Sequence, residues 1–170
     1  FLASRGLGDV YKRQEQPMSL EAVKDHFAKF NMEHRIVVLE RSTATVEDAA
    51  REHAVGPDQI GKTLAFKLDD MPILIVVAGQ ARIDNRKYKQ HFSRKAKMLN
   101  PDEVLQYTGH AIGGVCPFGL PAPLPVYLDI SIQKHREIIP AAGDRYSAIR
   151  LSIAELEQYA LSSGWVDVCG

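Results

Sequence analysis

The strongest constraint on the fold is an uninterrupted apolar run, Ile73–Ala78, that closely follows an alternating segment. In that alternating segment, Lys62–Leu68, large apolar side chains occupy every second position, which is typical of a strand with one buried face. The apolar run has no polar face and predicts a central strand covered on both sides. Asp69–Pro72 supplies turn residues between the two. Together they predict a hairpin in the middle of a sheet.

Further helices and strands are predicted around this hairpin. Helices are expected at 19–30, 45–54, 101–107 and 152–160, three of them after a capping Ser or Thr, and a further helix is expected in the basic segment 82–97. Short strands are expected at Ile36–Leu39 and Val126–Ile132, and Arg136–Ile139 and Tyr146–Leu151 are expected to form a strand pair around the Gly143–Asp144 turn. This order predicts an α+β fold: a single compact domain with a mixed, partly barrel-like β-sheet and surrounding helices.

The start of the chain does not fit this pattern. Phe1–Gln14 has no helical or strand period and no initiator Met, and Met18 is the expected natural start. We interpret residues 1–17 as a non-native or disordered extension and residues 18–170 as the domain. A length of 170 residues agrees with one domain.

Composition excludes several classes of function. The formal net charge is zero and the pI is about 7.2, so no overall field attracts nucleic acid or membrane, and a charged partner requires a local patch. No apolar run is long enough to cross a bilayer. The two cysteines, Cys116 and Cys169, have no metal-site or disulfide-framework spacing. We therefore expect a cytoplasmic protein without a metal or cofactor.

A loop rich in glycine and proline, Thr108–Pro125, is the first candidate site. Glycine permits positive φ and close backbone approach, while proline fixes φ, so the loop is expected to be irregular but stiff. Gly113 and Gly114 can present consecutive N–H groups to an oxyanion or a carbonyl oxygen. A structural connector with several turns is the open alternative.

Lys62 is the second candidate. In a strand it points the same way as Leu64 and Phe66, towards the core, and a lysine at the edge of an apolar pocket could hold a phosphate or a polarised carbonyl. A solvated lysine remains the alternative. Gly56–Thr63 also matches the phosphate-binding pattern G-x-x-x-x-G-K-[ST]. However, here a helix precedes the motif and a strand follows it, the reverse of the order that binds phosphate.

Other residues carry weaker signals. Cys116 is either a nucleophile or a small buried thiol, His110 is a possible base or substrate contact, and Asp129 either caps a bulge or faces a site. A basic segment lies between residues 82 and 97 and would suit nucleic-acid phosphates or form a solvated helix face. Its cationic residues are Arg82, Arg86, Lys87, Lys89, Arg94, Lys95 and Lys97.

The order and spacing of these motifs resemble the YbaK-type family, whose domain also occurs as the editing insertion of bacterial prolyl-tRNA synthetases. The motifs are Gln59–Phe66, Ile73–Ala78, Gly109-x-x-x-Gly113-Gly114-x-Cys116-Pro117-x-Gly119, Val126–Asp129 and Ala142–Gly143. The resemblance implies a metal-independent hydrolase that removes a wrongly attached amino acid from tRNA. It implies that Lys62 binds the acceptor-end phosphate or orients the ester. Gly113–Pro117 would hold the carbonyl or the terminal ribose while water or a substrate group attacks.

Three positions depart from the family pattern. Leu39 stands where cysteine-removing members have Tyr, His110 where an aromatic residue is usual, and Cys116 where Ser is common. With Pro117 and Asp129 these are the expected substrate-binding residues, and their departures leave the amino acid open.

The expected function is therefore that of a trans-editing hydrolase that cleaves the ester of mischarged aminoacyl-tRNA. Lys62, Gly113 and Gly114 form its expected catalytic group, and the basic segment contacts tRNA. Expected partners are aminoacyl-tRNA and, as a candidate, an aminoacyl-tRNA synthetase, with the protein a monomer or homodimer. The alternatives are a non-catalytic module that binds tRNA or a small ligand, and a P-loop-type nucleotide hydrolase.

Overall fold

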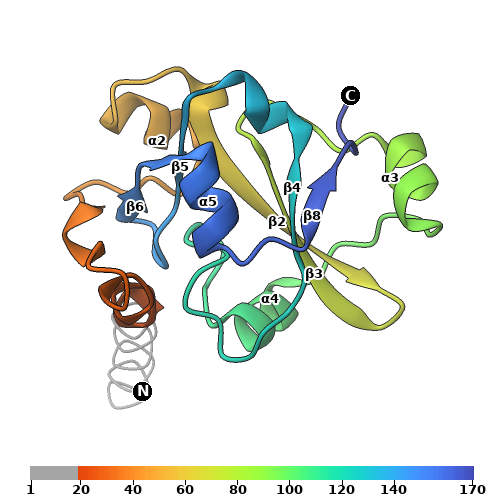
Figure 1. The fold of residues 1–170 in the computed structure, drawn as a ribbon, viewed down its shortest axis with the longest axis horizontal. Coiled ribbons are helices and arrows are strands. Elements are labelled where there is room, and N and C mark those ends of the chain that lie inside the picture. Colours follow the sequence, from red (N-terminus) through yellow and green to blue (C-terminus); the bar gives the residue numbers. More distant parts are fainter. Residues whose placement is uncertain (1–18) are drawn as a thin grey trace, which may run out of the picture.

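A curled, mixed six-stranded sheet forms the centre of the computed structural model, which describes residues 19–170 (Figure 1). The strand order is β7-β5-β2-β3-β4-β8, and a separate two-stranded sheet pairs β1 with β6. The strands are β1 (Ile36–Val38), β2 (Ile60–Leu68), β3 (Met71–Ala78), β4 (Val126–Asp129), β5 (Glu137–Pro140), β6 (Ser147–Ile149), β7 (Leu151–Ser152) and β8 (Gly164–Val166). The predicted α+β fold with a mixed sheet is confirmed.

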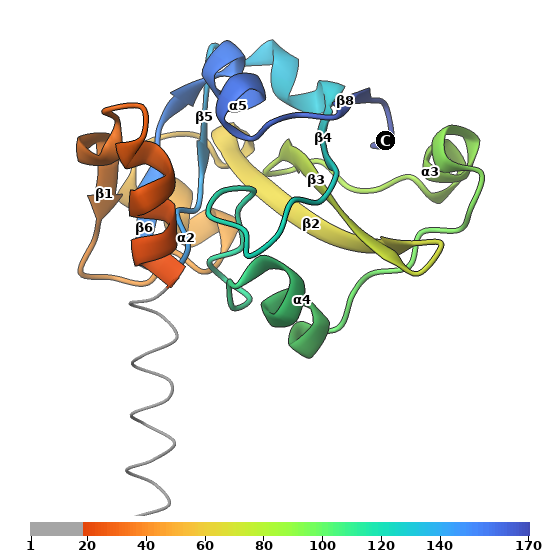
Figure 2. The same ribbon diagram turned by 60° about the horizontal axis from the view of Figure 1, so that its bottom comes forward.

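Helices surround the sheet. They are a helical segment at 19–28, α2 (Val46–Glu52), α3 (Asn85–Phe92), α4 (Pro101–Thr108) and α5 (Ile153–Tyr159), with 3-10 turns at Glu33–Arg35, Pro57–Gln59 and Ile130–Lys134. Figures 1 and 2 show α3 at the end of the molecule opposite β1, β6 and α2. None of these described helices is long and apolar enough to cross a membrane.

The predicted hairpin is the longest antiparallel pairing. β2 and β3 pair from Gly61–Ala78 to Leu68–Met71, and Asp69–Asp70 turns the chain with both residues at positive φ. Two-residue turns with positive φ match the right-handed twist of the strands. β3 is buried from Pro72 onwards and lies between β2 and β4, so the prediction of a central strand is confirmed.

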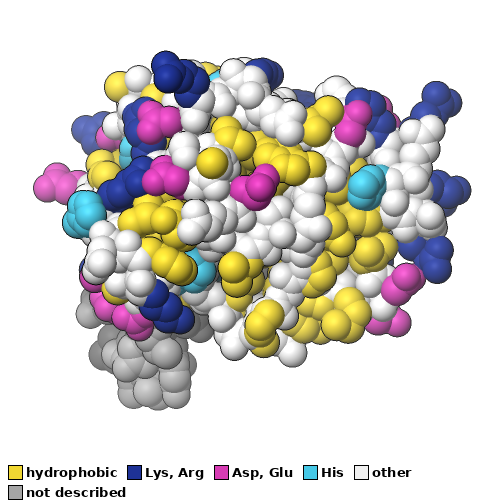
Figure 3. All heavy atoms as spheres, in the orientation of Figure 1, with side chains coloured by type: hydrophobic (Ala, Val, Ile, Leu, Met, Phe, Trp, Pro, Cys, Tyr) yellow, Lys and Arg dark blue, Asp and Glu magenta, His cyan; other side chains and the backbone are white. Residues whose placement is uncertain are grey.

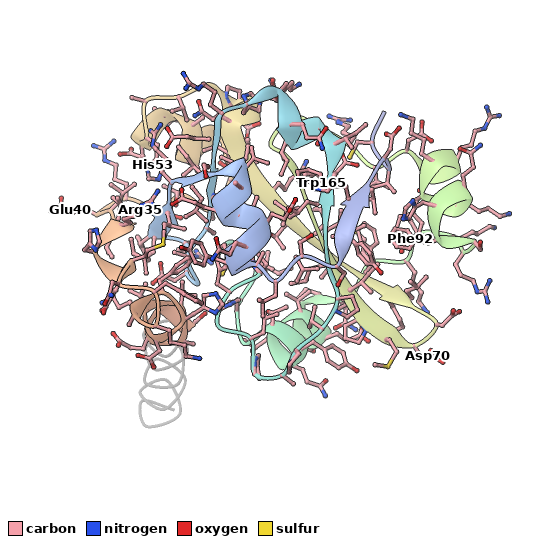
Figure 4. All side chains as sticks on the ribbon, in the orientation of Figure 1. Arg35, Glu40, His53, Asp70, Phe92 and Trp165 are labelled. Carbon is pink, nitrogen blue, oxygen red and sulfur yellow. The ribbon has the colours of Figure 1, made fainter. Side chains whose placement is uncertain are left out.

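Apolar side chains cover both faces of this hairpin. On one face Leu74 and Val76 pack in a cluster with Phe27, Phe118 and Leu156. On the other, Phe66, Ile73 and Ile75 pack with Tyr88 of α3 and with Val168. Phe92, on the side of α3 that faces the sheet, lies 5.2 Å from the Tyr127 ring between centroids (Figure 4). Burial on both faces explains why Ile73–Ala78 tolerates no polar residue.

Several predicted boundaries are confirmed and several are wrong. Thr45 caps α2, and Ser152 with Glu155 forms the capping box of α5. Ser19 is the first described residue and is already helical, and its hydroxyl donates to Gly143 O instead of capping a helix. The expected strand Val126–Ile132 ends at Asp129, whose carboxylate caps a 3-10 turn. The expectation for residues 1–17 lies outside the described residues.

The predicted pair of C-terminal strands is also only partly right. β5 does pair antiparallel with the later segment, but through β7, at Glu137–Ser152 and Ile138–Leu151. β6 instead pairs with β1, from Ile36–Ile149 to Val38–Ser147. The predicted strand 146–151 is therefore split between two sheets.

Candidate functional site

A cavity of about 270 Å³ opens along the exposed edge of β2. The walls come from the start of α2, from β2, from the segment before α4 and from the glycine-rich loop; Figure 2 shows α4 and that loop lying along β2. The lining is mostly apolar, with three threonines, and Lys62 is the one charged residue among the described residues that line it. A small apolar cavity with few polar groups is typical of a ligand site.

The cavity exists because β2 loses its neighbour. β5 pairs with β2 only at Ile60 and Gly61. Further along the strand, the segment before α4 takes over, since Leu99 N donates to Ala65 O at 3.1 Å and Lys67 N donates to Lys97 O at 2.8 Å. Thr63 lies between the last residue paired with β5, Gly61, and the Leu99–Ala65 contact, and it lines the cavity.

Lys62 and Gly113, two of the three residues of the expected catalytic group, both line this cavity. The Lys62 ammonium donates a hydrogen bond of 2.7 Å to Ala81 O, on the segment that follows β3. Burial lowers the pKa of Lys62, a shift that the Cys169 thiol partly opposes and Arg82 reinforces. An ammonium has three donors, so this contact leaves two for a ligand.

Gly113 and Gly114 differ in whether their backbone N–H groups are available to a ligand. Gly113 has a φ of 100°, and a Cβ there would lie 3.1 Å from the Ala44 Cβ. Gly114 packs against Asp144 so closely that a Cβ would come within 2.4 Å of the Asp144 Cα. Its N–H donates to Ala111 O at 3.0 Å. The predicted pair of free glycine amides is therefore wrong for Gly114.

The next three predicted substrate contacts lie in the core rather than in the cavity. His110 and Cys116 are fully buried, and Pro117 is buried beside them. The His110 ring pairs with Ser19 Oγ through Nδ1 and with Phe118 O through Nε2, at 2.7 Å for the latter. Burial lowers the pKa of His110 and raises that of Cys116 to about 12. Both side chains therefore belong to the packing of the loop, and neither is among the residues that line the cavity.

Asp129 and Leu39 are also placed away from the cavity lining. The Asp129 carboxylate is fully buried and accepts from Ser131 N at 2.9 Å and from Val168 N at 2.8 Å. It therefore holds the end of β4 to the C-terminal segment, the structural alternative of the sequence analysis. Leu39 is half-buried, and its N–H donates to Tyr146 O.

The basic segment forms α3 and the extended chain after it. Two of its seven cationic residues are paired: Lys87 contacts Asp167 and Cys169 O, and Arg94 contacts Asp69. The other five are exposed and make no ion pair with a described residue: Arg82, Arg86, Lys89, Lys95 and Lys97. Figure 3 shows Lys and Arg side chains projecting from the end of the molecule that carries α3. Lys97 precedes Met98, a cavity-lining residue, whereas no residue of α3 is among the residues that line the cavity.

The phosphate-loop match has the wrong geometry. Residues 56–63 pass from the 3-10 turn Pro57–Gln59 into β2, and no helix starts at Lys62. The helix N-terminus that would face a nucleotide phosphate is replaced by a strand. Within residues 19–170, no group of three or more His, Cys, Asp and Glu side chains could hold a metal ion.

Sequence reasoning missed Thr63, Met98 and Ile112. Met98 and Ile112 line the cavity although each is more than half exposed. Thr63 Oγ1 is buried without a hydrogen-bond partner among the described residues. Exposed apolar residues at Met98 and Ile112 carry no local sequence signal, and the position of Thr63 depends on where two distant segments leave β2.

Comparison with known proteins gives a consistent result. The profile described as "Aminoacyl-tRNA editing domain" matches residues 40–159. The uncharacterized protein YwhH of Bacillus subtilis (strain 168) is 49% identical over 153 residues, which cover 89% of this chain and 98% of YwhH. The proline–tRNA ligase of Persephonella marina is 30% identical over 112 residues, 65% of this chain but only 20% of the ligase.

Solved structures agree with these sequence matches. A protein proposed to be a trans-editing enzyme for prolyl tRNA synthetase superimposes with a TM-score of 0.81 at 30% identity. The match covers 89% of this chain and 97% of that protein. A hypothetical protein at 21% identity and a TM-score of 0.73 shares the fold.

Proposed function

The chain belongs to the aminoacyl-tRNA editing domain family, and we propose that it is a trans-editing hydrolase that cleaves the ester of mischarged aminoacyl-tRNA. The observation that carries the proposal is that Lys62 and Gly113 line one small apolar cavity at the open edge of β2. A volume of about 270 Å³ suits a single aminoacyl group, and the cavity opens to the surface where the rest of a tRNA would remain outside.

Each wall of the cavity has a role in this proposal. The apolar walls hold the amino acid side chain. The Lys62 ammonium, fixed by Ala81 O, binds the terminal phosphate or ribose with its remaining donors. Gly113, without a side chain, lets the ribose approach the backbone, and its main-chain N–H faces no described partner.

The proposed reaction is hydrolysis without a covalent enzyme intermediate. Water forms a bond to the ester carbon, the bond to the ribose oxygen breaks, and the leaving oxygen takes a proton, giving a free amino acid and uncharged tRNA. The neighbouring ribose hydroxyl of the substrate can relay that proton. No His, Cys, Asp or Glu is among the described lining residues, so the step as proposed relies on positioning by Lys62 and backbone groups.

The partners follow from the same proposal. The chain spans about a fifth of the proline–tRNA ligases that it matches, so it corresponds to one domain of such an enzyme. A separate chain with this domain would act on aminoacyl-tRNA after a synthetase has released it, in the cytoplasm. The exposed residues Lys95 and Lys97, which precede the cavity residue Met98, are the proposed first contacts with the acceptor strand.

A second candidate is a binding module that holds aminoacyl-tRNA without hydrolysing it. The absence of an imidazole, thiol or carboxylate from the described cavity lining favours this reading. Both candidates bind aminoacyl-tRNA in this cavity, and only the first hydrolyses it.

A panel of mischarged tRNAs tests the proposal. We expect release of at least one amino acid with multiple turnovers, loss of that activity in Lys62→Ala, and loss in Ala44→Trp, which fills the cavity beside Gly113. Ala154→Trp, at an exposed position of α5 away from the cavity, is the matched control and should retain activity. Binding without turnover of any tRNA would establish the second candidate, and full activity in Lys62→Ala would contradict the proposed site.

A further inference from the structure

We propose that the aminoacyl group docks on Thr63 as a one-residue β-bridge, an inference that rests on the proposed function. In this arrangement the α-ammonium of the substrate donates to Thr63 O, and the ester carbonyl accepts from Thr63 N–H. The substrate class is then defined: esters of amino acids with a free α-amino group. Esters of N-acylated amino acids and of α-hydroxy acids carry only a neutral donor at that position and are disfavoured.

The pairing of β2 shows which way the Thr63 backbone points. Ala65 and Lys67 bond on the edge away from β3, through Ala65 O and Lys67 N. Residues two apart in a strand direct their N–H and C=O groups to the same edge. Thr63 is two residues before Ala65, so its N–H and C=O also point away from β3, towards the cavity that it lines.

Nothing within residues 19–170 pairs with these two groups. On one side, β5 ends at Pro140, which has no N–H, and the chain after it pairs with β6 through the Ala141–Ala148 bridge. On the other side, the chain leaves β2 after Leu99 because Asn100 caps α4. No hydrogen bond from another described residue reaches Thr63 N, O or Oγ1. The gap is one residue long.

A strand residue whose backbone N–H and C=O are unpaired in an apolar cavity wall can bind a ligand that carries one matching donor and one matching acceptor. Half-buried backbone groups without a partner cost free energy that a ligand can recover. An aminoacyl ester carries a donor at its α-nitrogen and an acceptor at its carbonyl, spaced as in a peptide residue. Such a group completes an antiparallel hydrogen-bonded pair with Thr63, in the way that extended peptides add to open sheet edges.

The same geometry places the amino acid side chain. Residues directly opposite each other in an antiparallel pair project to the same face of the sheet. Ala65, two residues after Thr63, packs on this face with Leu99 and Val104. The amino acid side chain therefore enters the apolar part of the cavity, and the ester carbon stays at the edge of β2.

The test compares three substrates on the same tRNA: an aminoacyl ester found active in the panel, its N-acetyl derivative and the corresponding α-hydroxyacyl ester. We expect kcat/KM to fall about tenfold or more for the second and third, because each offers Thr63 O only a neutral donor in place of the charge-assisted hydrogen bond of the α-ammonium. In the intact protein, replacing the peptide N–H of Thr63 by an ester oxygen should also slow hydrolysis about tenfold. The same backbone replacement at Asp70, in the hairpin turn away from the cavity, is the control (Figure 4).

The outcomes separate this inference from the proposed function. Equal hydrolysis of the free and N-acetylated esters would overturn the Thr63 bridge and leave the hydrolase intact. If no aminoacyl-tRNA is hydrolysed at all, the proposed function fails, and the bridge that rests on it fails too. The substrate series uses the unaltered protein, so it decides the matter even if the backbone ester at position 63 lowers stability.

Discussion

The Lys62 ammonium is bound to the carbonyl oxygen of Ala81 at 2.7 Å. This contact ties a cavity residue of β2 to the chain beyond β3, and burial at this position lowers the pKa of the lysine. The charge is thus held in place before any ligand arrives, which reduces the entropy lost on binding.

Replacing Lys62 with Met should weaken substrate binding while leaving the fold intact. A hydrogen bond to a charged group contributes about 1.5–3 kcal/mol, so we expect KM to rise roughly 10- to 100-fold in steady-state deacylation assays. Lys67→Met is the matched control, since Lys67 lies on the same strand but pairs with Glu103 at 2.8 Å. An equal rise in KM for both variants would contradict a specific role for Lys62.

Gly114→Ala should destabilise the protein strongly. A Cβ at Gly114 would lie 2.4 Å from the Asp144 Cα, and backbone atoms cannot move aside easily. We expect a loss of about 2 kcal/mol or more in the free energy of unfolding, measured by chemical denaturation. Gly56→Ala is the control, because no atom lies within 4 Å of a Cβ there. A Gly114→Ala protein as stable as Gly56→Ala would show that the Asp144 contact is absent.

Cys116 should be chemically inert and dispensable for hydrolysis. Burial raises the pKa of its thiol to about 12, and that of Cys169 also to about 12. Neither thiol should react with a thiol-specific reagent in the native protein, and both should react after denaturation. Cys116→Ala should keep kcat close to that of the parent. A loss of kcat by several orders of magnitude in Cys116→Ala, at unchanged stability, would instead support the role of Cys116 as a nucleophile.

Stability should fall as the pH drops below about 6.5, the ordinary pKa of histidine. Burial lowers the pKa of His110 in the folded state, so the unfolded chain takes up a proton first and stability is lost with acid. This group contributes at most about 1.4 kcal/mol per pH unit. The free energy of unfolding, measured between about pH 7 and 5, should decline less steeply in His110→Asn than in the parent.

Two observations refine this acid prediction. Burial also lowers the pKa of His26 and His53, so His110→Asn should flatten the pH dependence without abolishing it. His91→Asn, at an exposed position of α3, is the matched control for the substitution itself. The same slope in His110→Asn and the parent would mean that His110 does not titrate on unfolding.

Lys95 and Lys97 should contribute more to tRNA affinity than Lys87. Both are exposed and precede the cavity residue Met98, whereas Lys87 is bound to Asp167. Replacing both with Gln should raise KM and reduce the magnitude of the slope of log affinity against log salt by about 1.4 to 1.8, as expected for two lost phosphate contacts. Lys87→Gln should change that slope little. The reverse order would place the tRNA on α3.

The sequence predicted the elements that depend on local pattern. Alternation in β2 and the two-sided apolar run in β3 define the hairpin, and the family pattern led to Lys62 and Gly113. The predictions that failed concern which side chains of the glycine-rich loop are buried in the core and which face the cavity. Nothing local distinguishes a loop histidine that faces a ligand from one such as His110, which bonds to Ser19 and Phe118 O.

Thr63 shows a different limit of prediction. Its open backbone depends on where β5 stops, at Pro140, and on where the chain turns into α4, after Leu99. Both positions lie more than 30 residues further along the chain, so a reading of β2 alone cannot find the gap. Long-range strand pairing has to be known first.

The alanines of the cavity wall are positions at which the volume of the cavity can be changed. They come from separate parts of the chain: Ala44, Ala49, Ala65, Ala141 and Ala148. Enlarging any one of them narrows the space by a methyl or two while the main chain of β2 stays as it is. Single substitutions at these alanines can therefore change the largest amino acid side chain that the cavity accepts, while the backbone contacts between β2 and the ester stay the same.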